Sequence, residues 1–140
     1  MRPATILACL AMLLIVNCKK QGSAGPVSFN GTWELYKVSG QATVNYSPGN
    51  GNDLKFLGDN YQMFTNGSLT KSGKFFVADD TTATTSTCLI FPAGQFNRRI
   101  IYDSNYNAPK VFIELSNNTL TLVSGCFAYD GGSFSYYARK

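Results

Sequence analysis

Histidine is absent from this chain of 140 residues, and with it the side chain that most often serves as a general base near neutral pH. Without histidine, neither a serine nor a cysteine nucleophile has its usual activating partner. The four cysteines include no Cys-x-x-Cys spacing, which gives little support to a zinc site or a thiol redox site. The eight acidic residues fall mostly at expected strand ends and turns. We therefore expect a protein that is not an enzyme and that uses no metal or other cofactor.

Strong charge of one sign is also missing from most of the chain. The formal net charge is +4, but Arg2, Lys19 and Lys20 lie ahead of the expected folded domain. From Phe29 to Lys140, nine basic residues stand against eight acidic residues, so this part carries a net charge of +1. Proteins that bind nucleic acid concentrate lysine and arginine on one face. The sequence therefore predicts no nucleic-acid partner.

The first residues of the chain predict an export signal. Arg2 precedes an apolar run, residues 4–16, which is too short to span a bilayer and has the length of a signal-peptide core. The run ends in Ile15-Val16-Asn17-Cys18, which resembles the lipobox of bacterial lipoproteins, although Asn17 stands where Gly, Ala or Ser is usual. The resemblance implies that residues 1–17 are removed and that Cys18 is acylated, with palmitate among its lipids. The alternative is ordinary secretion, with cleavage near residues 23–25.

Residues 18–28 predict a flexible tether between this lipid and a folded domain. They contain glycine, serine and proline without apolar periodicity. The tether begins with Lys19-Lys20-Gln21 and contains no acidic residue. Acidic residues at these positions would resemble the signals for inner-membrane retention or surface export in some bacteria, and this chain lacks them. We therefore expect a protein held in the cell envelope by its N-terminal lipid, at the outer membrane and facing the periplasm.

Residues 29–140 read as one all-β domain. Val111–Ser116 and residues 119–122 alternate apolar and polar side chains, as half-buried strands do, and Asn66-Gly67 is a tight-turn signal between two such runs. Since a long meander with free edges invites aggregation, we predict closure into an antiparallel up-and-down β-barrel of about eight strands, with an open sandwich as the alternative. The expected strands are 32–38, 53–57, 60–65, 68–78, 87–91, 98–102, 110–115, 119–123 and 133–139.

Cysteine count supports an exported protein. We expect Cys9 to leave with the signal peptide and Cys18 to become the anchor, so that Cys88 and Cys126 remain as one pair for an oxidising compartment. We expect a disulfide between them, with two buried free thiols as the alternative.

The two ends of the domain carry a family resemblance. Gly31-Thr32-Trp33 stands near its start and Tyr136-Tyr137-Ala138-Arg139 near its end. This pairing resembles the lipocalins, and over residues 29–140 the chain resembles the short lipocalin-like lipoproteins of bacteria. The resemblance implies that Gly31 and Trp33 open the first strand and that Arg139 lies over the indole, closing one end of the barrel. The alternative is that Trp33 is an ordinary core side chain and Arg139 is merely solvated.

Function is expected at the opposite, open end. Residues 39–52 join the first two strands as a long loop in which Tyr46 is the one aromatic residue, whereas residues 79–87 are expected to be an extended connection. Such a barrel is either packed or holds a small apolar or lipid-like ligand, with tyrosine hydroxyls near its mouth. The alternative is a protein-binding barrel, an inhibitor or an envelope scaffold, which acts through its loops. The sequence predicts no oligomeric state. Candidate contacts with a ligand or partner are Tyr36, Tyr46, Tyr61, Tyr102 and Tyr136, and the side chains expected to point inward are Tyr36, Phe56, Tyr61, Phe75, Tyr102, Phe134 and Tyr136.

Overall fold

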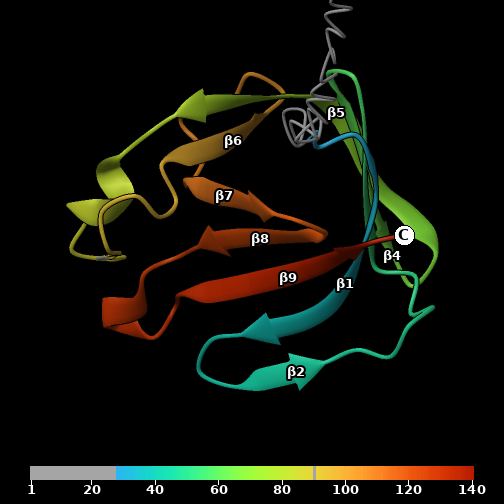
Figure 1. The fold of residues 1–140 in the computed structure, drawn as a ribbon, viewed down its shortest axis with the longest axis horizontal. Helices are drawn as coiled ribbons and strands as arrows, with labels where there is room; N and C mark the ends of the chain where they lie inside the picture. Colours follow the sequence, from blue (N-terminus) through green and yellow to red (C-terminus); the bar gives the residue numbers. More distant parts are fainter. Residues whose placement is uncertain (1–27, 90) are drawn as a thin grey trace, which may run out of the picture.

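The structure is a computed structural model that describes residues 28–89 and 91–140 (Figure 1). The expected signal peptide, Cys18 and all of the tether except Ser28 lie outside the described residues. No helix in the described part has the length and apolar character needed to cross a membrane. The elements in chain order are β1 (Gly31–Ser39), β2 (Thr43–Asn45), β3 (Asp53–Leu57), β4 (Asn60–Thr65), β5 (Ser68–Asp79), η1 (Thr82–Thr84), β6 (Arg98–Tyr102), β7 (Val111–Ser116), β8 (Thr119–Ser124), η2 (Phe127–Tyr129) and β9 (Ser133–Arg139).

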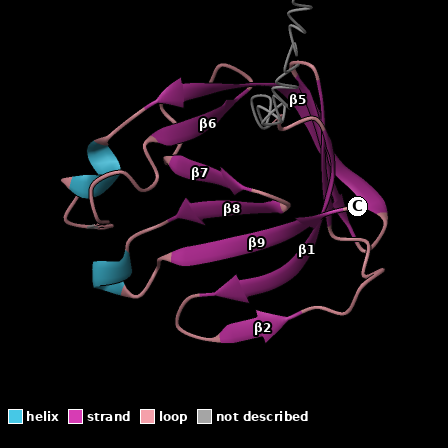
Figure 2. Cartoon of the chain, viewed as in Figure 1, coloured by secondary structure: helices cyan, strands magenta, loops and turns pink. Residues whose placement is uncertain are grey.

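The strands close into a barrel. From β3 to β9 each strand pairs antiparallel with the next one along the chain, and β1 joins the two ends of this series by pairing with both β3 and β9 (Figures 1 and 2). The short β2 pairs with the second half of β1, beyond the point where β3 pairs with it. The predicted eight-stranded up-and-down barrel is confirmed, and the open sandwich is wrong.

Two details of the strand prediction are wrong. Residues 87–89 form turns rather than the start of a strand, because the half-buried Leu89 and Phe91 pack against a cluster outside the barrel instead of in its wall. All three residues of β2 are exposed, so the polar loop in which they lie gives no period-two pattern to find. The remaining predicted strands match observed strands within one residue at each end.

The barrel lumen is filled by large side chains. Strand alternation brings one face of each strand inward. Trp33 and Leu120 are fully buried, and Phe56 and Tyr61 keep only 1% of their surface exposed. The lumen core consists of Trp33, Leu54, Phe56, Tyr61, Phe75, Ile100, Ile113 and Leu120, with Tyr102 and Tyr137 packed against it.

A second apolar cluster lies outside the barrel wall. Residues 80–89 and 91–97, which we call the flap, include η1 and place Ala83 and Phe96 in one cluster with Phe112 of β7 and Val123 of β8. The predicted disulfide between Cys88 and Cys126 is confirmed, and it fastens the flap next to η2. The expected extended connection over residues 79–87 is therefore wrong, since η1 lies within it and its Ala83 is buried.

Three aromatic residues expected to face inward lie outside the lumen. Phe134 packs in the outer cluster, its ring stacks with Tyr136 at 5.9 Å, and Tyr36 is 39% exposed. Tyr36 falls at a register shift between β1 and β9, which breaks the strict alternation on which the prediction depended. Tyr137, one position later than Tyr136, points into the lumen instead.

Candidate functional site

Trp33 and Arg139 lie in contact at one end of the barrel. The guanidinium carbon of Arg139 lies 4.2 Å from the indole centroid, and its two terminal nitrogens donate to the carbonyls of Asn30 at 2.7 Å and Ser28 at 2.6 Å. Gly31 has φ 135°, and a Cβ built there would lie 2.9 Å from the guanidinium. The structure thus brings Gly31, Trp33 and Arg139 into one contact, in which glycine leaves room for the arginine.

A polar cluster lies where Tyr61 reaches the end of β6. The Tyr61 hydroxyl donates to Asp103 at 2.8 Å, and the ammonium of Lys71 lies 3.5 Å from the same carboxylate. The hydrogen bond from Tyr61 is the main cause that lowers the pKa of Asp103, while burial and then Asp103 raise the pKa of Tyr61. A Cβ at Gly73 would clash with the Asp103 carboxylate. These contacts join Tyr61 of β4 and Lys71 of β5 to Asp103, the residue that follows β6.

The opposite end of the lumen holds a cavity of about 210 Å³, which we call the mouth cavity. Residues from β3, β4 and β5 line it together with residues from β1, β8 and β9. In a ring of eight strands β4 and β8 are four strands apart and therefore opposite, so only the lumen can bring their side chains to one space. The apolar lining consists of Leu35, Leu54, Met63, Phe64, Leu122 and Tyr137, and the polar lining consists of Asn52, Asp53, Thr65 and Thr70.

Tyr102, Tyr137 and Tyr46 are successive neighbours in space from the lumen to the mouth cavity. Burial and, after it, the nearby Tyr46 of the loop between β2 and β3 raise the pKa of Tyr137 to about 12. Burial also raises the pKa of Tyr102, whose hydroxyl is inaccessible and has no hydrogen-bond partner among the described residues. An unpaired buried hydroxyl costs roughly 1–3 kcal/mol, so Tyr102 is a group that a bound water or ligand would satisfy.

The five candidate tyrosines therefore divide into groups. Tyr61 and Tyr102 belong to the lumen, their ring centroids 4.6 Å apart. Tyr46 is half-buried beside the mouth, and its backbone N–H donates to the carbonyl of Tyr36 at 2.9 Å. Tyr36 and Tyr136 lie on the outer face with their ring centroids 6.2 Å apart, so they are not lumen contacts.

The sequence prediction missed Tyr137 and the aliphatic lining of the mouth. On β8, Leu120 and Leu122 alternate with threonines, and this period-two pattern could have identified the lumen face of that strand. For β9, both Tyr136 and Tyr137 are aromatic, so the sequence alone offers no choice between its two faces. The structure shows which face of β9 points inward: Tyr137 pairs with Leu120 and with Leu35, and all three side chains face the lumen.

The size of the mouth cavity limits what could enter. An apolar cavity of about 150 Å³ can hold benzene, whereas pockets for drug-sized molecules start near 300 Å³. At about 210 Å³ the mouth cavity suits one substituted ring or a short acyl chain. No family model, curated protein or solved structure matches this chain.

Proposed function

We propose that this chain is a lipid-anchored, lipocalin-like binding protein of the cell envelope that holds a small apolar ligand in the mouth cavity. The observation that carries the proposal is the cavity itself, where apolar side chains from opposite walls of the barrel meet beside the phenol of Tyr137. Apolar lining with a few polar groups at the rim is typical of small-molecule sites. The proposal assigns the chain no enzymatic activity and no cofactor.

The ligand in this proposal is small and has one polar group. The lumen beyond the mouth is occupied by Trp33, Phe56 and Phe75, so a long acyl chain has no room to extend. The phenol of Tyr137, which lines the cavity, offers a hydrogen bond to a carboxylate, carbonyl or hydroxyl group. A phenol or a medium-chain fatty acid such as octanoate meets these requirements.

Methionine labelling tests this function directly. Met63 lines the mouth cavity and is the one methionine after residue 12, so ¹³C-methyl methionine places one probe in the domain. We expect the Met63 methyl resonance to shift saturably when octanoate or p-cresol is added to the full-length chain in detergent. Absence of a saturable shift at millimolar octanoate and p-cresol would contradict the proposal.

The location follows from the first residues of the chain. We propose that Cys18 carries the lipid and that the barrel is held at the outer membrane, on its periplasmic side. The support is the apolar run that ends at Cys18 and the lysines that follow it. Palmitate labelling of cells should mark the wild-type chain but not Cys18→Ala, and fractionation should place the labelled chain with outer membranes. Labelling of both chains would exclude Cys18 as the attachment site.

A second candidate is a protein-binding barrel that acts through its outer surface. The observation in its favour is that the deep lumen is filled while Val44 of β2 remains 47% exposed in the loop between β1 and β3. A photo-crosslinking residue at position 44 should then give one adduct of discrete mass in intact cells. An adduct together with an unresponsive Met63 methyl would favour this candidate over the ligand-binding one.

A further inference from the structure

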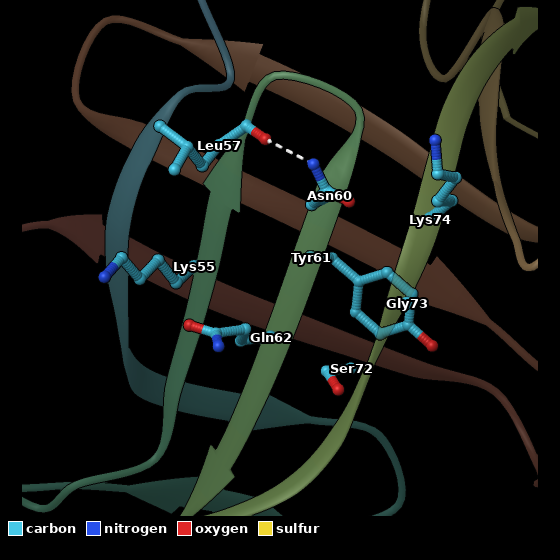
Figure 3. A pocket seen from close by; sticks show the side chains of 8 residues that line it. All are labelled: Lys55, Leu57, Asn60, Tyr61, Gln62, Ser72, Gly73 and Lys74. Carbon is cyan, nitrogen blue, oxygen red and sulfur yellow. Dashed lines mark hydrogen bonds between the residues drawn. The ribbon is translucent and has the colours of Figure 1, made fainter.

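The outer face of β3, β4 and β5 carries a hollow of about 580 Å³, which we call the outer groove (Figure 3). Leu54 and Phe56 of β3 and Tyr61 of β4 point into the lumen, so the residues between and beside them point outward. Figure 3 shows two lysines on either side of amide and hydroxyl side chains. The side chains that line the groove from outside the barrel are Lys55, Leu57, Asn60, Gln62, Ser72 and Lys74.

Strand register orders these side chains into two rows. Gln62 of β4 pairs with Lys55 on one side and with Ser72 on the other. Asn60 likewise pairs with Leu57 and with Lys74, one step along the same strands. Opposite neighbours in an antiparallel sheet are about 5 Å apart, so an ammonium, an amide and a hydroxyl stand side by side in the first row.

Most of the polar side chains of the outer groove have no partner among the described residues. Lys55, Gln62 and Ser72 make no side-chain hydrogen bond or ion pair with any other residue in the described part of the chain. Lys74 pairs with Asp59 at 2.8 Å, but both side chains are more than half exposed. An exposed ion pair of this kind contributes little stability, so a bound anion can compete for the Lys74 ammonium.

We propose that the outer groove binds an acidic saccharide unit. Sugar hydroxyls both donate and accept hydrogen bonds, as do the amides of Asn60 and Gln62 and the hydroxyl of Ser72. A carboxylate or phosphate on the sugar accepts charge-assisted hydrogen bonds from Lys55 or Lys74. An apolar ligand gains little, because Leu57 is the one large apolar side chain exposed in the groove. The inference does not depend on the ligand of the mouth cavity.

The experiment is a titration of the ¹⁵N-labelled full-length chain in detergent with tetragalacturonate. The side-chain amide resonances of Asn60 and Gln62 should shift saturably, and neutral maltotetraose should bind at least tenfold more weakly. Lys55→Gln and Gln62→Ala should each weaken tetragalacturonate binding about threefold to tenfold, the range for loss of one exposed charged or polar contact. Lys37→Gln is the matched control, since it removes the same charge from β1, where Lys37 lies over Tyr136 instead.

Three results would overturn the inference. The first is the absence of saturable shifts at millimolar tetragalacturonate. The second is an equal loss of affinity in Lys37→Gln and Lys55→Gln, which would show attraction by overall charge. The third is full displacement of tetragalacturonate by phosphatidylglycerol vesicles with no preference for the sugar, which would identify a phosphate surface. Octanoate should not compete, so failure here and failure of the mouth cavity are distinguishable.

Discussion

Arg139 covers the indole of Trp33 and holds two backbone carbonyls just before β1. Arg139→Ala removes the cation–π contact and both hydrogen bonds, so we expect it to lower the free energy of unfolding by about 1–3 kcal/mol. Trp33 is the sole tryptophan, and its fluorescence during urea unfolding reports directly on this end of the barrel.

Arg139→Lys is the control for charge alone. Lysine keeps the charge but lacks the planar fork that reaches both Ser28 and Asn30, so its stability should fall between the wild-type and alanine chains. An alanine variant within about 0.3 kcal/mol of wild type would mean that Arg139 is effectively solvated, the alternative interpretation of the sequence.

Asp80 fixes the base of the flap through ion pairs with Lys110 at 2.8 Å and Arg99 at 3.3 Å. Burial by itself would raise the pKa of Asp80, but hydrogen bonds from Lys110 and Thr82 lower it to about 2, from an ordinary 3.8. A lowered folded-state pKa gives stability that is present above about pH 4 and is lost as the pH falls toward 2.

Asp80→Asn should therefore destabilise the protein at pH 7 by on the order of 1–2 kcal/mol, and this difference should shrink toward pH 2. Urea midpoints of both chains between pH 2 and 7 measure it. Asp79→Asn is the matched control, since Asp79 is exposed and makes no ion pair within the described residues. A constant difference across this pH range would rule out the linkage.

At the scale of elements, the flap depends on its disulfide. Cys88 and Cys126 are 38 residues apart, and closing such a loop stabilises a fold by about 4 kcal/mol in the chain-entropy model. The double variant Cys88→Ala/Cys126→Ala should lose about 3–4 kcal/mol in urea unfolding. It should also speed amide exchange in residues 80–97 more than in β3 and β4. Uniform acceleration along the chain would argue that the flap is not a separate unit.

Strand positions could be predicted, whereas the burial of each strand face could be predicted only in part. Hairpin signals such as Asn66-Gly67, where φ is 50° and 79°, located the turns because few residues tolerate these angles. The flap escaped prediction since it buries apolar residues against the outside of the barrel. Phe134 shows the same limit, because a strand covered on both faces gives an aromatic residue two places to pack.

At the scale of the whole molecule, closure follows from β1, which pairs with β3 on one edge and with β9 on the other. The sequence indicated this through Trp33 and Arg139, which are register partners although they are more than one hundred residues apart. The mouth cavity could not be predicted in the same way. Its volume is the space left in the lumen after the side chains on six strands have packed. No local sequence pattern determines how much space is left.

Leu122 tests whether the two walls of the barrel make one site. It projects from β8 into the mouth cavity, which Met63 of β4 lines from the opposite wall. Leu122→Phe should occupy part of the roughly 210 Å³ and weaken octanoate binding about tenfold. Stability should change by less than about 1.5 kcal/mol, because the added ring enters free space rather than a packed core.

Leu69→Phe is the control for the change in side chain, since Leu69 is 52% exposed on β5 and does not line the cavity. Octanoate titrations followed at the Met63 methyl compare the two variants with the wild-type chain. If Leu122→Phe binds octanoate as tightly as Leu69→Phe while the Met63 signal still shifts, the ligand lies on the β4 wall alone. In that case octanoate would bind beside Met63 without using the β8 wall, and the two walls would not make one site.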